Sequence, residues 1–363
     1  MADKKADMPD SLRASFEATK VEYRQLGKSG LRVSVPVLGA MSFGSKLWQP
    51  WVEDDEAKVT ALLKAAYDCG LNTWDTANVY SAGVSETLIG NAVKSLKIPR
   101  HKLTLLTKCF GTVGEEPGAN HIKYPEMKGT KDYVNQGGLS RAAIFNAVDA
   151  SLKRLQMEYI DLLQIHRFDT SVPVEETMKA LHDLVQCGKV RYIGASSMWT
   201  FQFAGMQTVA EKNGWTKFVS MQNHYSLCYR EEEREMNKYC AQTGVGLIPW
   251  SPLYRGALAR PVNSDATPRS EAAATGNRAF GGGPSEADKA IIGRVEELAK
   301  KKGWPMAQVA LAWILQKGTV PIVGFSSVER MMQAVEVKGK TLTDEEVKYL
   351  EEPYVPKAVQ GHA

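Results

Sequence analysis

Four side chains that could together protonate a carbonyl oxygen each follow a run of apolar residues. They are Asp75, Tyr80, Lys108 and His166. Free tyrosine and lysine both have pKa values of about 10. A lysine ammonium within hydrogen-bond reach would lower the pKa of the phenol by roughly 1–3 units, which would make Tyr80 a usable acid near neutral pH. A carboxylate would hold the lysine charged and in place, and a histidine could orient and polarise the carbonyl oxygen.

These four residues can supply a proton but not the hydride that reduction of a carbonyl also needs. No side chain delivers a hydride, whereas a nicotinamide cofactor does. The alternative is that Asp75 and Lys108 form a structural ion pair, but Tyr80 and His166 stand at matching places in the pattern, which favours a catalytic group.

The elements that carry these residues alternate between strands and helices. An N-terminal β-hairpin is predicted at residues 23–34. Eight strands, most of them separated by a helix, are predicted at residues 35–40, 71–74, 102–108, 159–165, 190–194, 218–221, 245–248 and 319–323. This order predicts an α/β fold with a single (β/α)8 TIM barrel and extra C-terminal helices. No G-x-G-x-x-G follows any strand, which disfavours a doubly wound dinucleotide domain.

Three segments are expected along the chain. Residues 1–20 are polar and are predicted to be a flexible N-terminal segment, residues 21–353 form the barrel, and residues 354–363 form a C-terminal tail. Residues 110–138 are predicted to be a loop that covers the site, and residues 263–284 a mobile surface loop. Ser85 is predicted to cap the helix that follows Tyr80.

The composition excludes several classes of function. The 363 residues carry a net charge of +4, and basic and acidic residues are interleaved, as in residues 230–235, which are predicted to be a solvated helix face. No nucleic-acid partner is therefore expected. The five cysteines contain no C-x-x-C pair, so the sequence predicts neither a metal site nor a disulfide framework. This use of cysteine predicts a reducing, cytoplasmic location. No apolar run is long enough to predict a membrane span.

Two motifs carry a resemblance to a known family. Residues 72–77 (Asn-Thr-Trp-Asp-Thr-Ala), with Tyr80 and residues 85–86 (Ser-Glu), resemble the signature of the aldo-keto reductases. Residues 164–167 (Gln-Ile-His-Arg) resemble that family's histidine strand. The similarity runs from about residue 23 to about residue 337. Residues 134–261 resemble fungal members of the aryl-alcohol dehydrogenase and versiconal hemiacetal acetate reductase type.

The resemblance implies a role for each site residue. Tyr80 would be the general acid, Lys108 its activator, Asp75 the partner of the lysine and His166 the donor that positions the carbonyl. The cofactor would be NADPH. The residues that would contact it are Gly39, Met41, Ser196, Ser197, Gln222, Trp250, Ser251, Pro252, Leu253, Gly256, Leu258, Gly324, Ser326, Arg330 and Gln333.

The last strand favours NADPH over NADH. Ser326 and Ser327 open a helix with Arg330 in its first turn, which makes an anion site that binds the 2′-phosphate of NADP in the family. Two positions depart from the family pattern. Gly324 stands where some members have lysine, and Ala334 where many have asparagine.

The substrate is predicted to be a small carbonyl compound. Trp48, Trp51, Phe110 and Trp199 follow strands, so they could form an aromatic pocket, although buried packing would explain some of them. Aryl aldehydes are expected, or a carbonyl compound of secondary metabolism, reduced reversibly to the alcohol. His224 is expected to be a wall residue.

Two other functions are alternatives to a reductase. A cofactor-binding regulatory subunit, like those that attach to potassium channels, also resembles this sequence. A barrel isomerase or hydrolase without nicotinamide would need a metal cluster or a nucleophile–base pair, which the sequence lacks. The sequence indicates no oligomeric state.

Overall fold

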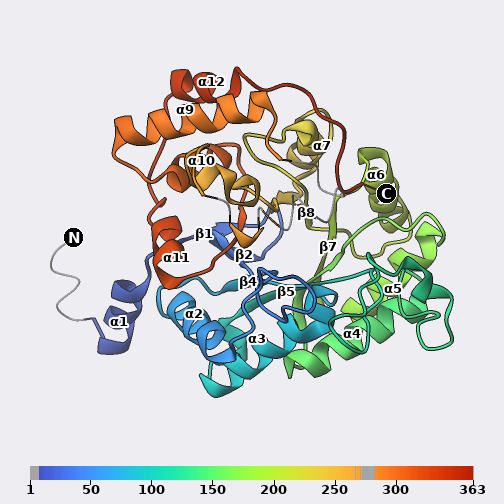
Figure 1. The fold of residues 1–363 in the computed structure, drawn as a ribbon. Helices are drawn as coiled ribbons and strands as arrows, with labels where there is room; N and C mark the ends of the chain where they lie inside the picture. The colour runs from blue at the N-terminus through green and yellow to red at the C-terminus, as the bar shows by residue number, and fades with distance from the viewer. Residues whose placement is uncertain (1–7, 266, 270, 272–282, 363) are drawn as a thin grey trace.

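A parallel barrel forms the centre of the molecule (Figure 1). The computed structural model describes residues 8–265, 267–269, 271 and 283–362. Eight parallel strands pair in the order β10-β3-β4-β5-β6-β7-β8-β9. The amides of Val320 and Ile322 donate to the carbonyls of Leu247 and Pro249, which closes the sheet between its two ends. The predicted (β/α)8 barrel is confirmed. The strands are β3 (Val37–Gly39), β4 (Thr73–Asp75), β5 (Thr104–Cys109), β6 (Ile160–Ile165), β7 (Val190–Ser196), β8 (Ser220–Gln222), β9 (Gly246–Leu247) and β10 (Ile322–Gly324).

Helices surround the strands. Those between successive strands bury an apolar face against the sheet; in α5, for example, Met178, Leu181 and Leu184 are fully buried. Around the barrel run α2 (Glu56–Asp68), α3 (Val84–Ser95), α4 (Arg141–Leu155), α5 (Val174–Gln186), α6 (Thr200–Lys212), α7 (Met236–Thr243), α10 (Met306–Gln316) and α11 (Val328–Val335). Two further helices, α9 (Glu286–Lys302) and α12 (Asp344–Glu351), lie together beyond α10 (Figure 1). These are the predicted extra helices.

The N-terminal hairpin packs against one end of the barrel. Strands β1 (Glu22–Gln25) and β2 (Arg32–Val35) pair antiparallel, as predicted. Leu26 and Val33 from this hairpin join a core cluster with Leu106 of β5 and Leu162 of β6. Because this apolar cluster covers one end of the barrel, the polar residues at the carboxyl ends of the strands are left to form the site.

The structure bears on three local predictions. Residues 10–18, inside the segment predicted to be flexible, form helix α1 (Asp10–Ala18), which has no buried residue. Ser85 does not cap α3: the cap position is Gly83 at φ +90°, and the Ser85 hydroxyl donates to the Ala40 carbonyl instead. The predicted surface loop at 263–284 falls partly outside the described residues.

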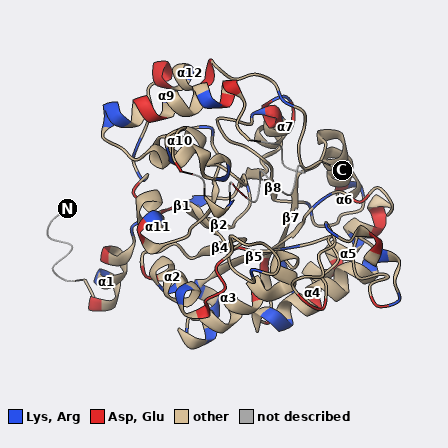
Figure 2. Cartoon of the chain, in the orientation of Figure 1, with Lys and Arg blue, Asp and Glu red and all other residues tan. Residues whose placement is uncertain are grey.

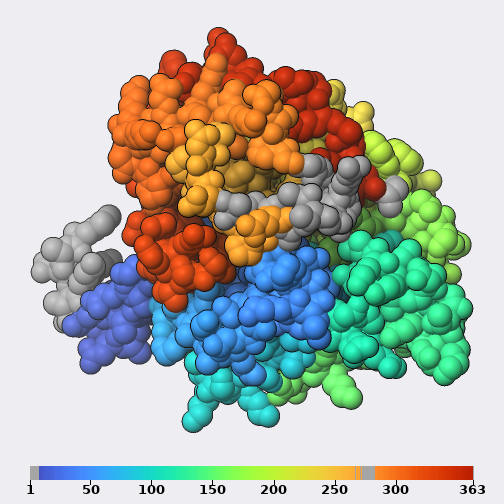
Figure 3. Space-filling view, in the orientation of Figure 1, coloured from blue at the N-terminus to red at the C-terminus, as the bar shows by residue number. Residues whose placement is uncertain are grey.

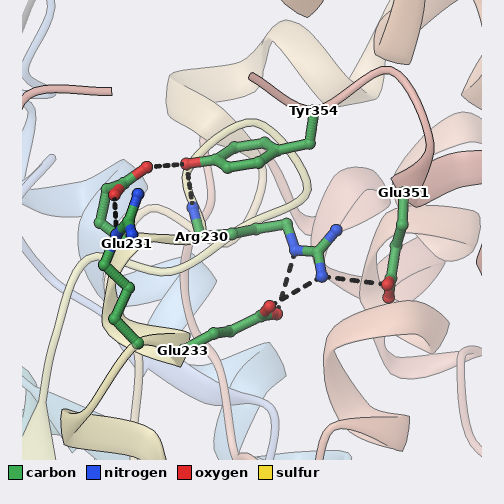
Figure 4. Close-up of a pocket in the computed structure, with 6 residues that line it drawn as sticks. Arg230, Glu231, Glu233, Glu351 and Tyr354 are labelled. Atoms are coloured by element: carbon green, nitrogen blue, oxygen red, sulfur yellow. Dashed lines mark hydrogen bonds and ion pairs between the residues drawn. The ribbon is translucent and has the colours of Figure 1, made fainter. Parts of the chain in front are cut away.

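The acidic run at 230–235 is not a solvated face. Glu231 and Glu232 are buried, within a short 3-10 helix, η5 (Glu231–Glu233). Glu231 accepts from the Tyr354 hydroxyl, and Arg230 pairs with Glu233 and with Glu351 of α12 (Figure 4). The prediction was wrong because the partners of these carboxylates come from the far end of the chain.

The C-terminal residues, predicted to form a tail, lie against the barrel. The Lys357 amide donates to Glu231, the Gln360 amide donates to the Tyr229 hydroxyl, and His362 contacts Glu232 at 2.8 Å. On the outer helices α9 and α12, both signs of charge alternate (Figure 2). Within the described residues, no helix has the length and apolar character needed to cross a membrane.

Candidate active site

An ammonium group joins two neighbouring strands at the carboxyl end of the barrel. The Lys108 Nζ atom lies 2.5 Å from Asp75 Oδ2, 2.7 Å from the Thr76 carbonyl oxygen and 3.4 Å from the Tyr80 hydroxyl. The Lys108 side chain is fully buried. Because β4 and β5 are paired parallel strands, Asp75 and Lys108 reach the same end of the barrel. The structure therefore brings together three of the four predicted catalytic residues.

Two buried amides complete the surroundings of Asp75. Gln164 and Gln222 each donate from Nε2 to Asp75 Oδ1 at 3.0 Å, and Gln222 also donates to Gln164 Oε1 at 2.9 Å. Gln222 was predicted to hold the cofactor, whereas its side-chain donors are used here. Gln164 was not predicted as a site residue. It stands two positions before His166 on β6, so both side chains point to the same face of the sheet, and that period of two was the signal for it.

His166 is the fourth member. It directly follows β6, and its ring lies edge-on to the Tyr80 ring, with 6.0 Å between ring centroids. Burial, followed by the charges of Arg167 and Lys108, lowers the pKa of His166 well below its usual value. The imidazole is therefore neutral at pH 7, and a neutral imidazole can donate one N–H to a carbonyl oxygen.

The pKa of Tyr80 differs from the expectation. Burial raises the pKa of the Tyr80 phenol above its ordinary value, and the lowering effect of Lys108 does not overcome it, because Asp75 acts in the opposite direction. Burial alone would lower the pKa of Lys108, but Asp75 and Tyr80 raise it, so the group stays an ammonium. Tyr80 is thus a protonated donor at neutral pH in this structure, and its pKa is not tuned to neutrality.

The predicted nicotinamide residues lie together at the ends of β7 and β8 and after β9. The Trp250 Nε1 donates to Ser197 Oγ at 2.9 Å, and Ser196 Oγ donates to the Gln222 carbonyl. Ser197 and Ser251 have φ angles of 38° and 53°, a left-handed backbone that costs free energy in residues other than glycine and that gathers at functional sites.

His224 is a wall residue, as expected. It is fully buried, and its ring stacks between those of Tyr229 and Trp250, each at 4.1 Å between centroids. Neither of its ring nitrogens has a hydrogen-bond partner within the described chain. The His224 ring therefore supports the indole of Trp250 by stacking against it.

A second cluster of donors stands at the start of α11. Ser327 caps this helix by accepting from the Arg330 amide, and the Arg330 guanidinium donates to Ser326 Oγ at 3.3 Å. Arg260 lies close enough for the Arg330 charge to lower its pKa, after the larger effect of burial. Arg260 was not predicted. Gly324 pairs in register with Gly39, so these two predicted positions are also neighbours.

The other predicted cofactor positions belong to segments near these clusters. Pro252 and Leu258 are buried, Leu253 packs against the core cluster that includes Leu258, and Gly256 has a φ of 98°. The Gln333 carbonyl accepts from Gln308. Met41 follows β3 and is partly buried.

The four predicted substrate residues do not all lie near Tyr80. The Trp48 ring lies 5.9 Å from the Tyr80 ring and 6.2 Å from the Trp51 ring, so Trp48 lies beside the proton donor and Trp51 lies behind Trp48. Phe110 packs instead against the apolar cluster that contains Cys109. Trp199 is partly exposed and contacts the His362 ring edge-on. In Figure 3 the amber chain between β9 and α9 lies against the blue loop after β3, where the Arg269 guanidinium is 4.6 Å above the Trp51 ring.

The cavity drawn in Figure 4 is separate from this constellation. It is lined by Arg230, Glu231, Glu233, Arg234, Glu351 and Tyr354. Its charged groups are paired with one another, so it fastens the C-terminal segment to η5. The proton donor, the neutral imidazole and the ammonium all belong to the barrel mouth, and that is where carbonyl chemistry fits.

Comparison with known proteins identifies the family of the chain. The aldo/keto reductase family model matches residues 37–354. The chain is 54% identical to an aldo-keto reductase of Fusarium vanettenii, over 99% of this chain and 98% of the relative. It is 51% identical to a putative aryl-alcohol dehydrogenase of Schizosaccharomyces pombe (93% and 97% covered) and to the versiconal hemiacetal acetate reductase of Aspergillus parasiticus (93% and 98%). With this agreement over nearly its whole length, the chain belongs to the aldo/keto reductase family.

Proposed function

We propose that this protein is an NADPH-dependent carbonyl reductase that converts an aldehyde or ketone reversibly to the alcohol. The observation that carries the proposal is the contact of one buried ammonium with both Asp75 and Tyr80, beside the neutral His166. Two relatives are named as dehydrogenase and reductase, which supports this reaction class. Aryl aldehydes, or a carbonyl compound of secondary metabolism, are the proposed substrates. Trp48 beside Tyr80, with Trp51 next to Trp48, supports an aromatic one.

The residues at the mouth fit a nicotinamide nucleotide. Trp250 offers a flat indole beside Ser197, and the buried Asn223 Oδ1 has no partner in the described chain, so it can accept from a carboxamide. Ser326, Arg330 and Arg260 can hold a phosphate. When bound, the cofactor supplies the hydride.

The protein's own residues supply the proton and orient the substrate. His166 donates its N–H to the carbonyl oxygen, which fixes the carbonyl near the Tyr80 hydroxyl. Tyr80 then protonates the developing alkoxide. The Lys108 ammonium stabilises the phenolate that remains, and Asp75 holds that ammonium in place.

The assay that tests this function follows cofactor absorbance with NADPH or NADH across matched aromatic and aliphatic carbonyl compounds. We expect NADPH to be consumed faster than NADH, and aryl aldehydes to be reduced. Absence of turnover over the whole panel with both cofactors would overturn the proposal.

We further propose that residues 21–353 are the catalytic barrel and that the protein acts in the cytoplasm.

Removing the guanidinium at α11 should change cofactor choice. Arg330→Met should raise the KM for NADPH by roughly tenfold, because a charge-assisted contact to the 2′-phosphate is lost from an exposed site. The KM for NADH should change little, since NADH lacks that phosphate. Steady-state kinetics with both cofactors measures the difference, and equal effects on the two would place the phosphate elsewhere. Arg141→Met, on the exposed face of α4, is the control.

The raised pKa of Tyr80 predicts opposite pH profiles for the two directions. Reduction needs the protonated phenol, which exists below its pKa, so kcat/KM for reduction should stay level through neutral pH and fall only under strongly alkaline conditions. Alcohol oxidation needs the phenolate, so its rate should rise with pH over the same range. Initial rates in both directions across pH test this. A reductive rate that already falls below pH 8 would contradict a raised pKa.

A further inference from the structure

Arg167 is a cation at the barrel mouth that the mechanism above does not use. It directly follows His166 at the end of β6, and its Nη1 donates to the His166 carbonyl at 2.5 Å. Within the described chain the guanidinium makes no ion pair and no other hydrogen bond. Most of its donors are therefore available to a ligand.

Its neighbours place this guanidinium beside the reacting atoms. A Cβ on Gly361 would stand 3.6 Å from Arg167 Nη2, 3.4 Å from Trp250 Cζ2 and 3.6 Å from Ser197 Cβ, so all three groups border one small space. The charge of Arg167 also lowers the pKa of His166 and opposes the rise in the pKa of Tyr80. Arg167 thus lies among the proton donor, the imidazole and the proposed nicotinamide wall.

The Arg167 guanidinium is partly shielded from water, and no counter-ion in the described chain neutralises its charge. Burial lowers the pKa of the guanidinium, and the nearby Tyr80 opposes that effect only in part. Keeping a cation partly desolvated without a counter-ion costs free energy, and binding of an anion reduces that cost. The carboxylate of the catalytic cluster, Asp75, already has Lys108, Gln164 and Gln222 as partners.

The C-terminal residues close over this place. Gln360 is held by the Tyr229 hydroxyl, and His362 by Glu232 and by the Trp199 ring. Gly361 lies between these two anchors and borders Arg167. Enclosure of this kind lowers the local dielectric constant and strengthens a contact between a guanidinium and an anion.

We infer that Arg167 binds a carboxylate of the substrate, so that the preferred substrates are oxo acids with the carboxylate close to the carbonyl group that is reduced. The planar guanidinium suits a carboxylate because it can donate two parallel N–H bonds. Held in this way, the carbonyl oxygen of the oxo acid faces Tyr80 and His166. The carboxylate is unchanged in the reaction, and the product is a hydroxy acid. This inference rests on the proposed reductase function.

Two other roles for Arg167 need to be separated from this one. The guanidinium could act only through the pKa of Tyr80, in which case its loss would slow neutral and anionic substrates alike. It could instead bind a phosphate of the cofactor, although the cluster at α11 has its own guanidiniums for that purpose. A comparison between a charged substrate and its neutral ester separates carboxylate binding from these two roles, and the affinity for NADPH separates the two roles from each other.

The test measures kcat/KM for phenylglyoxylate and for methyl phenylglyoxylate with the wild type, Arg167→Met and Arg167→Lys. In Arg167→Met we expect the ratio of acid to ester to fall by about 10- to 100-fold, chiefly through the KM for the acid, because a charge-assisted contact is lost. Arg167→Lys should recover part of the ratio, since it keeps the charge but loses the planar donor pair. Arg141→Met is the matched control.

Each outcome decides between the roles. An unchanged ratio in Arg167→Met, with a folded protein by circular dichroism, overturns the inference, and so does a loss that appears only in NADPH affinity. If the wild type reduces other carbonyl compounds of the panel but neither of these two, the inference is overturned and the reductase function stands. If it reduces no compound of the panel with either cofactor, the proposed reductase function fails instead. In that case calorimetric titration of phenylglyoxylate into the NADP⁺ complex still tests Arg167, because weaker binding in Arg167→Met is expected and equal binding contradicts it.

Discussion

Tyr80→Phe should lower kcat/KM for carbonyl reduction by about three orders of magnitude, within the range that general acid catalysis contributes. The substitution removes a single oxygen atom, the one that lies 3.4 Å from the Lys108 ammonium. The ring itself keeps its contacts with Trp48 and His166. Loss of activity would therefore report the missing proton and not a rearranged pocket.

Two measurements make this result interpretable. Titration of protein fluorescence with NADPH should give nearly the same affinity for Tyr80→Phe and the wild type, since the proposed cofactor contacts lie on other residues. Tyr349→Phe, which removes a hydroxyl from the surface of α12, is the control and should keep full activity. A reductive rate in Tyr80→Phe near that of the wild type would assign the proton to another group.

The strand ends could be predicted from the sequence because their pattern is local. Each apolar run before Asp75, Lys108 and His166 was visible, and the parallel order of the barrel then brings successive strand ends to one mouth. Gln164 could have been found by the same argument, since it shares a face with His166. Most of the cofactor residues came only with the family resemblance, whereas the aromatic substrate residues were predicted from their places after strands.

The properties that were missed depend on contacts between distant parts of the chain. Glu231 is buried because Tyr354 and Lys357 reach it from more than 120 positions away, and no periodicity in the run reports that. The pKa of Tyr80 was expected to fall because Lys108 is close. Its direction depends on how much burial opposes that charge, which is a property of the folded mouth.

The left-handed conformation of the backbone after Tyr80 was not predicted. Ser81 and Ala82 both have a φ of 52°, and the Ser81 hydroxyl accepts from the Ser45 amide. Left-handed residues that are not glycine cost about 1–3 kcal/mol each and persist when the surrounding structure holds them. Here they turn the chain immediately after the proton donor, so the loop after β3 takes part in holding Tyr80.

Lys108→Met should be both inactive and unstable, and the two effects can be separated. Without the ammonium, the phenolate that follows proton transfer loses its stabilising charge, so kcat/KM should fall by at least about 100-fold. The variant also leaves Asp75 buried without its counter-ion, which typically costs about 3–5 kcal/mol of unfolding free energy. Gln164 and Gln222 still donate to that carboxylate, so the low end of this range is expected.

A second substitution separates the ion pair from the catalyst. Asp75→Asn combined with Lys108→Met removes both buried charges, so the double variant should regain part of the stability lost by Lys108→Met, measured by urea unfolding. It should regain no activity, because the amide cannot replace the ammonium beside Tyr80. If the double variant recovered both stability and turnover, Asp75 and Lys108 would be a structural pair, and the proton relay through Lys108 would have to be abandoned.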